Sequence, residues 1–134
     1  MLKVVGTLFI KDRKLLLDKP RKRPTHQMVG GKVEPNENPT QAAYREACEE
    51  LVTDTLDPSL FEFIMDFEET ASSDPNLKIH FHLFRYNGIL NCEPQTSDEI
   101  EGFLWYNSSL GESMLTPTLK HYVIPYCIKN NLID

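Results

Sequence analysis

The chain contains few of the features that would place it among secreted or membrane proteins. It has only three cysteines in 134 residues. Cys48, Cys92 and Cys127 form no paired motif, which argues against a disulfide framework and against a zinc site. The apolar N-terminal segment is too short to span a membrane, is interrupted by Lys3 and Gly6, and lacks a signal-peptide cleavage pattern. We therefore expect a cytoplasmic protein that does not bind membranes.

An excess of positive charge is also absent. Fourteen Lys and Arg residues stand against 20 Asp and Glu, and the net charge is −6, which disfavours binding to a nucleic acid polymer. The hydrophobic fraction of 40% and the charged fraction of 25% are typical of a soluble globular protein. Without repeats or linkers, residues 1–134 are expected to form a single domain. Both a monomer and a homodimer remain open.

Hydrophobic periodicity predicts the order strands, helix, strands, helix. Strands are expected at 3–10, 14–18, 28–33, 61–68, 77–86 and 103–106. The last helix is expected to start at Thr116-Pro117, to run to about Asn130, and to have one apolar side. That side comprises Leu119, Val123, Ile124, Cys127 and Ile128. This order indicates an α/β protein with a mixed sheet and helices on both faces.

The first helix has the clearest signals in the chain. Asn38 is a good N-cap, Pro39 suits the first helical position, and Gln41 is placed to complete a capping box. The pattern then continues to about Leu51. We therefore predict a helix from Pro39 to Leu51.

Three glutamates share one face of this helix. Glu46, Glu49 and Glu50 stand at i, i+3 and i+4, where like charges repel by about 0.2–0.5 kcal/mol per pair. A bound divalent cation would reverse that penalty, and hard carboxylate oxygens suit Mg²⁺ or Mn²⁺ better than zinc. Taken alone, the pattern is also typical of a solvated acidic helix face.

The residues around this face are more specific. The motif Gly, five residues, Glu, seven residues, Arg-Glu, an apolar residue, any residue, Glu-Glu is filled by Gly31, Glu37, Arg45, Glu46, Glu49 and Glu50. At this spacing the chain closely resembles the Nudix hydrolase family. It departs from the family's box where Val52 replaces Gly, Thr53 replaces an apolar residue and Val29 replaces a common Pro. Because valine resists positive φ, we predict that the helix runs past Val52 with ordinary helical angles.

The resemblance implies an α/β/α sandwich with a mixed central sheet that holds Mg²⁺ or Mn²⁺. By position, the metal ligands are Glu46, Glu49, Glu50 and the carbonyl of Gly31. Arg45 and Glu37 are then supporting residues that orient these glutamates. Glu34 is a candidate contact to the metal shell or the substrate, or else an ordinary exposed carboxylate.

Residues outside the box are weaker candidates. Similar enzymes take the general base either from the box, here Glu46, or from a later acidic loop, here Glu99, with Asp98 and Glu101 as rivals. Lys19 and Arg23 are candidate phosphate contacts, or simply part of a solvated loop. His80 and His82 share one face of a predicted strand. No third ligand is visible at a useful spacing, so we do not expect them to bind a metal.

The resemblance implies a metal-dependent pyrophosphohydrolase that cleaves a nucleoside diphosphate derivative. The first candidate is a MutT-like hydrolase of nucleoside triphosphates to the monophosphate and pyrophosphate. Leu115-Thr116-Pro117 lacks the Asn expected of an oxidised-guanine pocket. ADP-ribose, nucleotide sugars and dinucleoside polyphosphates are the alternative substrates. A non-catalytic nucleotide-binding module is the alternative of another class, and the intact glutamates argue against it.

Overall fold

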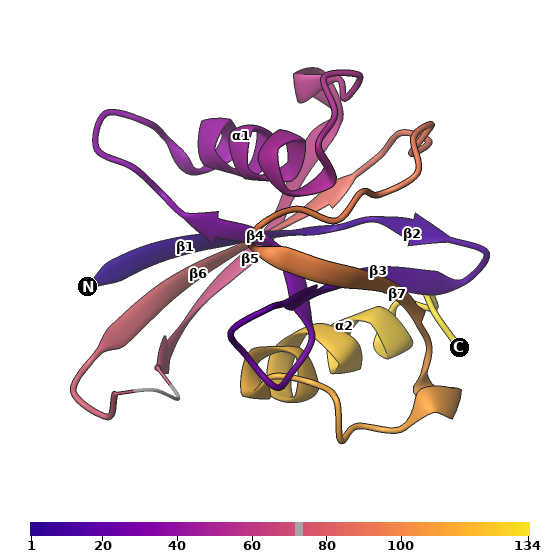
Figure 1. Ribbon diagram of the computed structural model, residues 1–134. Helices are drawn as coiled ribbons and strands as arrows, with labels where there is room; N and C mark the ends of the chain where they lie inside the picture. The colour runs from indigo at the N-terminus through magenta and orange to yellow at the C-terminus, as the bar shows by residue number, and fades with distance from the viewer. Residues whose placement is uncertain (72–73) are drawn as a thin grey trace. The chain divides into compact units, whose positions relative to one another are not determined.

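The computed structural model describes residues 1–71 and 74–134. Figure 1 shows the helices and strands of these residues, which form two compact units. The first unit comprises 1–8 and 29–93, and the second comprises 9–28 and 94–134. Among the described residues, no helix is both long and apolar enough to cross a membrane.

The sheet of the first unit contains strands of both orientations. Its members are β1 (Leu2–Leu8), the end of β4 (Gln27–Lys32), β5 (Phe61–Thr70) and β6 (Lys78–Tyr86). Strand β1 is central, antiparallel to β4 and parallel to β6, and β5 lies antiparallel to β6 at the edge. The 3₁₀ helix η1 (Pro58–Leu60) leads into β5. This parallel and antiparallel pairing confirms the predicted mixed sheet.

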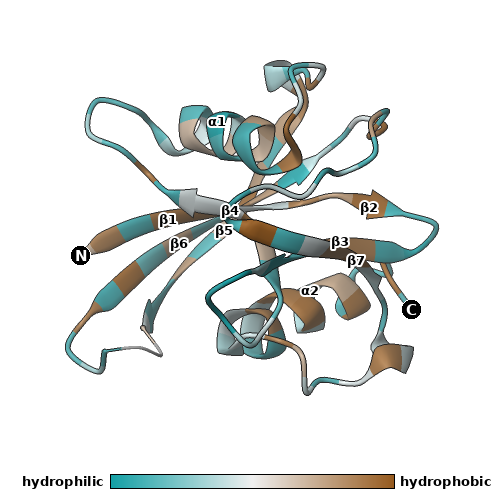
Figure 2. Cartoon of the chain, viewed as in Figure 1, coloured by the Kyte–Doolittle hydropathy of each residue, from teal (hydrophilic) through white to brown (hydrophobic). Residues whose placement is uncertain are grey.

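The helix α1 (Pro39–Leu51) confirms the predicted bounds. Asn38 Oδ1 accepts from the Gln41 backbone N–H at 2.8 Å, and Gln41 Oε1 accepts from the Asn38 N–H at 2.9 Å, so the capping box is complete. Polar and apolar residues alternate along α1 (Figure 2), and its buried residues are Ala42, Ala43, Ala47 and Leu51. The helix packs on this unit's sheet with contacts to β1, β5 and β6. Glu46, Glu49 and Glu50 lie outside this buried stripe.

The prediction for Val52 is wrong. The helix ends at Leu51, and Val52 adopts left-handed angles of φ 52° and ψ 56°. The Val52 N–H donates to the Glu49 carbonyl at 3.3 Å and the Thr53 N–H donates to the Cys48 carbonyl at 3.0 Å. These two bonds form a Schellman motif, which satisfies carbonyls that would otherwise lack a partner at the helix end. The chain therefore makes the turn that usually carries glycine, with valine in its place.

The second unit contains an antiparallel sheet centred on β3 (Lys14–Pro20). Its neighbours are β2 (Ile10–Lys11), β7 (Ile100–Tyr106) and the first two residues of β4. The 3₁₀ helix η2 (Ser108–Leu110) follows β7. The strand predicted at 3–10 is thus divided between β1 and β2, with Phe9 buried between them. The predicted strand at 103–106 begins earlier, at Ile100.

The last helix consists of two segments of different geometry. A π-helical segment, η3 (Leu119–Val123), precedes α2 (Ile124–Lys129), and the Ile124 N–H donates to the Leu119 carbonyl. Pro125 lacks an N–H and would clash with a carbonyl one turn earlier, so the wider turn accommodates it. The predicted apolar side is buried except for Ile128, which is exposed.

Candidate functional site

Two glycines of β4 allow close contacts, Gly31 with the helix α1 and Gly30 with the neighbouring strand β1. Any side chain at Gly31 would collide with the Glu46 carboxylate, since an ideal Cβ there would lie 2.5 Å from Oε2 and 2.6 Å from Oε1. A side chain at Gly30 would collide with the Val5 carbonyl and lie 2.8 Å from the Gly6 Cα. The Gly30 N–H donates to Glu50 Oε1 at 2.9 Å. The absence of a side chain at Gly31 thus leaves room for the Glu46 carboxylate, and the backbone N–H of Gly30 holds that of Glu50.

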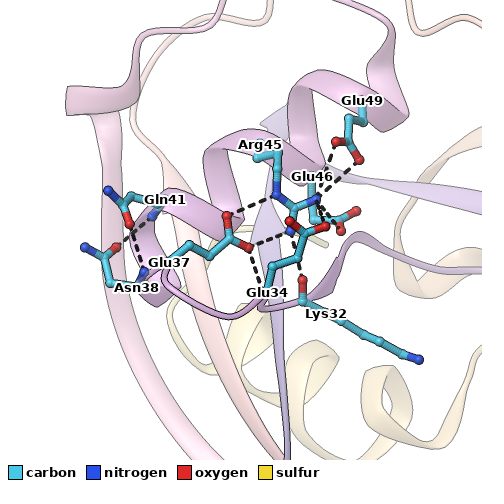
Figure 3. A network of polar contacts seen from close by, with 8 residues as sticks. All are labelled: Lys32, Glu34, Glu37, Asn38, Gln41, Arg45, Glu46 and Glu49. Atoms are coloured by element: carbon cyan, nitrogen blue, oxygen red, sulfur yellow. Dashed lines mark hydrogen bonds and ion pairs between the residues drawn. The ribbon is translucent and has the colours of Figure 1, made fainter.

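Arg45 is the centre of the polar network on this side of α1 (Figure 3). Its guanidinium donates to Glu37 twice, from Nη2 to Oε1 at 2.6 Å and from Nε to Oε2 at 3.1 Å. Nη2 also donates to the Lys32 carbonyl at 3.0 Å. A forked contact of this kind fixes both planes, so Arg45 is held against the segment that connects β4 to α1.

The remaining edge of the guanidinium faces more carboxylates. Nη1 of Arg45 donates to Glu46 Oε1 at 2.9 Å and lies 3.4 Å from both Glu49 oxygens and 3.8 Å from Glu34 Oε1. A single cation therefore serves four carboxylates, including that of Glu37. The formal charges of Arg45 and these four glutamates sum to −3, from four negative charges and one positive. Such a surplus at close range favours the binding of additional cations.

The pKa values in the cluster follow from these contacts. Burial raises the pKa of Glu46, and the nearby Glu49 and Glu34 raise it further, whereas Arg45 opposes both effects. The hydrogen bonds from Arg45 lower the pKa of Glu37. The same hydrogen bond to Glu37 is the main cause of a raised pKa at Arg45. Arg45 and Glu37 therefore remain an ion pair over a wide pH range.

The glutamates of the helix face differ in exposure. The side chain of Glu46 is 17% exposed, whereas that of Glu49 is 60% exposed. Glu50 is partly buried at the Gly30 N–H. A ligand could therefore reach Glu49 from solvent.

The donor set of this face fits a hard divalent cation. It consists of carboxylate oxygens and, at Gly31, a backbone position directly beside the Glu46 carboxylate. Mg²⁺ and Mn²⁺ prefer oxygen ligands of this kind. The uncompensated negative charge beside Arg45 supplies the electrostatic attraction. The structure thus brings together Gly31, Glu34, Glu37, Arg45 and Glu46, with Glu49 and Glu50 on the same helix.

The other sequence candidates belong to the second unit. Lys19 Nζ donates to Glu101 Oε1 at 2.7 Å and to the Pro20 carbonyl at 3.0 Å, so its charge is already paired. Arg23 and Glu99 are both exposed. The Glu99 carbonyl accepts from the Arg21 N–H at 2.9 Å, and the Arg21 side chain donates to the Ser97 carbonyl at 2.9 Å. The acidic loop is thus tied to the end of β3 through Arg21, a residue that the sequence pattern did not single out.

Comparison with known proteins identifies the family. The NUDIX domain model matches residues 2–117, which is most of the chain. The chain belongs to the Nudix family. It is accordingly a Nudix hydrolase, an enzyme that acts on phosphorus-containing acid anhydrides of nucleotide derivatives. No curated protein sequence matches this Nudix chain significantly.

Solved structures resemble the Nudix chain over nearly its whole length. A MutT protein from Methanosarcina mazei Go1 superposes with a TM-score of 0.77 at 19% identity, over 96% of this chain and 94% of that chain. A dihydroneopterin triphosphate pyrophosphohydrolase from E. coli gives a TM-score of 0.75 at 20% identity, over 96% and 95%. An Ap4A hydrolase from C. elegans gives 0.62 at 18% identity, over 98% and 92%. At these identities the likeness establishes the fold, which is the predicted α/β fold of the family.

Proposed function

We propose that this Nudix hydrolase cleaves the pyrophosphate link of a nucleoside diphosphate derivative and requires Mg²⁺ or Mn²⁺ to do so. The observation that carries the proposal is the carboxylate surplus around Arg45, which α1 and the segment before it provide, with Glu46 directly beside Gly31. Such a cluster is stabilised when a divalent cation binds. We further propose that residues 1–134 act as one catalytic domain.

In this proposal each group of the cluster has a distinct role. Glu46, Glu49, Glu50 and the Gly31 carbonyl would hold the cation, which when bound neutralises the diphosphate and polarises phosphorus. Arg45, fixed by its two hydrogen bonds to Glu37, holds the Glu46 carboxylate in place from the side. The exposed Glu34 carboxylate lies at the edge of this network, where it can reach the substrate or its water shell.

Hydrolysis requires a carboxylate that accepts the proton of the attacking water. The water oxygen forms a bond to one phosphorus, the bridging P–O bond breaks, and the other phosphate leaves with the bond's electrons. Glu46 and Glu99 are the two candidates for the base. Burial raises the pKa of Glu46, which makes this carboxylate a stronger base than an exposed one. Lys19 and Arg23 are the proposed contacts to substrate phosphates.

A nucleoside triphosphate, hydrolysed to the monophosphate and pyrophosphate, is the first candidate substrate. Its support is the resemblance of the fold to the MutT protein and to the pyrophosphohydrolase of a pterin triphosphate. The likeness to structures of an Ap4A hydrolase and a UDP-X diphosphatase supports dinucleoside polyphosphates and nucleotide sugars as alternatives, with ADP-ribose. A panel of these compounds, assayed for phosphate and pyrophosphate release with Mg²⁺, Mn²⁺ or EDTA, separates them.

Glu49→Gln is the sharpest test of the proposed metal site. We expect it to lower kcat by at least about 10²-fold, because the cation loses a ligand. The fold should stay intact, because the substitution removes a negative charge that repels its neighbours on the helix. Glu62→Gln, at an exposed position of β5 in the same unit, is the matched control and should leave kcat unchanged. Near wild-type kcat for Glu49→Gln at saturating Mg²⁺, or full turnover in excess EDTA, would contradict the proposal. No turnover of any compound would favour a nucleotide-binding module.

A further inference from the structure

Three side chains of β5 and β6 meet outside the glutamate face. One nitrogen each of His80 and His82 and one carboxylate oxygen of Asp66 all lie within 4.8 Å of one another. Asp66 is paired directly with His82 across the two strands, and His80 lies two residues before His82 on the same face of β6. We propose that Asp66, His80 and His82 form a second metal site, which takes Zn²⁺ or a similar transition-metal ion rather than Mg²⁺.

The donor set decides the class of metal. Imidazole nitrogens suit zinc, copper, iron and nickel, whereas Mg²⁺ prefers oxygen ligands. Two histidines and one carboxylate leave further coordination positions open for water, as in zinc sites with three protein ligands. Sequence spacing reveals no third ligand for the two histidines, whereas strand pairing places the Asp66 carboxylate beside them.

The orientation of the His82 ring suits coordination of a metal ion. Its Nδ1 lies 3.4 Å from the Val4 carbonyl of the neighbouring strand β1, a contact that makes Nδ1 the hydrogen-bond donor and leaves Nε2 free to bind a metal. Ligating histidines generally use their second nitrogen in this way. His82 is only 8% exposed, and a neutral imidazole is the form that binds metals.

His80 and Asp66 complete the site from the solvent side. His80 Nε2 lies 2.6 Å from Asp66 Oδ2, and the two histidine rings are 4.2 Å apart at a 40° tilt. In a tetrahedral zinc site with bonds of about 2.0 Å, ligand atoms lie about 3.3 Å apart. Rotation of the His80 and Asp66 side chains would lengthen their 2.6 Å contact to this distance. The backbone pairing of β5 with β6 would not need to change. The ion would take the place of the proton shared by His80 and Asp66.

The cross-strand neighbours of His80 carry opposite charges. Lys3 pairs with His80 on the β1 side and Glu68 pairs with it on the β5 side. The lysine repels a cation and the glutamate attracts one, so neither sign dominates. The affinity of the site should therefore come from its three ligands.

Strand register places this site two strands away from Gly31 on the same sheet. On β1, Val5 is paired with Gly31 on one side and with His82 on the other. His82 and Gly31 therefore lie in one row of the sheet, two strands apart, which corresponds to about 10 Å between their Cα atoms. Because paired residues project from the same face, the site lies on the face of the sheet that α1 covers. The two proposed sets of ligands have no residue in common, since this site uses Asp66, His80 and His82.

Zinc binding to the purified protein in excess Mg²⁺ tests the proposal without any activity assay. Isothermal titration should show one equivalent of Zn²⁺ bound, with affinity reduced at least about tenfold in Asp66→Asn and in His80→Ala. His121→Ala, which removes an exposed histidine of the second unit, should bind like wild type. Glu49→Gln should also bind normally. Circular dichroism spectra establish that each variant is folded.

A second measurement uses cobalt as the probe. Co²⁺ added to the wild-type protein should produce visible absorption bands that Zn²⁺ abolishes, and Asp66→Asn should lose them. Unchanged zinc affinity in both site variants, or no zinc binding by wild type, would overturn the proposal. Loss of zinc binding in Glu49→Gln alone would assign the ion to the glutamate face and would equally overturn it.

Discussion

Val52 offers a direct test of how this chain ends the helix α1. It holds left-handed angles of φ 52° and ψ 56° and is 51% exposed. A Cβ in this conformation costs about 1–2 kcal/mol. Glycine removes that cost, but it also increases the entropy of the unfolded chain by the equivalent of about 0.4–1 kcal/mol relative to alanine. The loss of the half-buried valine methyl groups opposes any gain, so Val52→Gly should leave stability unchanged or raise it slightly.

The difference in stability between glycine and alanine at position 52 does not depend on the packing of the valine methyl groups. Val52→Ala and Val52→Gly both lose the valine methyl groups, and only alanine keeps the strained Cβ. We therefore expect Val52→Gly to be more stable than Val52→Ala by about 0.5–1 kcal/mol, the strain relieved minus the entropy added. At Thr40, an exposed position within α1, the order should reverse, with alanine more stable than glycine by up to about 1 kcal/mol.

Urea unfolding monitored by far-ultraviolet circular dichroism measures these differences, provided that the slope m is the same for all four variants. For a chain of this length, 1 kcal/mol corresponds to a shift of about 3–5 °C in Tm. Alanine at position 52 that is as stable as glycine would refute the reasoning, because it would mean that the left-handed turn is not strained. Helical angles at Val52 in an experimental structure would refute it as well.

Two further predictions concern the network around Arg45. Glu37 has a pKa below its ordinary value of 4.5, so its contribution to stability is present above that value and is lost as the pH falls through the lowered pKa. Glu37→Gln should therefore flatten the dependence of Tm on pH on the acid side, and an unchanged profile would contradict the ion pair. Arg45→Lys keeps the charge but cannot form the forked contact. It should lower kcat of the proposed hydrolysis by about 10–100-fold, and wild-type kcat would show that the fork does not position Glu46.

The helix α1 could be predicted fully from the sequence because its determinants are local. Asn38, Pro39 and Gln41 define its start within four residues, and these contacts depend on no other part of the chain. Strand ends were less accurate. The strand predicted at 14–18 continues to Pro20, where β3 still pairs with Ile100 of β7. Pairing of this kind depends on residues distant in sequence, which periodicity does not reveal.

The composition of the candidate site also follows from local spacing. Gly31, Glu37 and Arg45 are brought together because α1 begins a fixed number of residues after β4. The cluster of Asp66 with His80 and His82 was missed because it depends on the register of β5 against β6. The register is regular from the pair Thr70–Lys78 to the pair Asp66–His82. It shifts at the irregularity between Phe63 and Met65. An assumed hairpin register would have identified Asp66.

The turn at Val52 shows why local propensity gave the wrong prediction there. Strain of about 1–2 kcal/mol opposes the two Schellman hydrogen bonds to the Cys48 and Glu49 carbonyls, each of which contributes about 0.5–1.5 kcal/mol. Contacts of Leu56 and Asp57, which follow Val52 in the chain, favour the left-handed turn over a longer helix. Leu56 is buried, and the Asp57 N–H donates to the Tyr86 hydroxyl at 3.1 Å. A helix that continued past Val52 would carry Leu56 away from this position and lose its burial, worth about 1.5–3 kcal/mol. The chain therefore keeps the left-handed exit even with a β-branched residue in it.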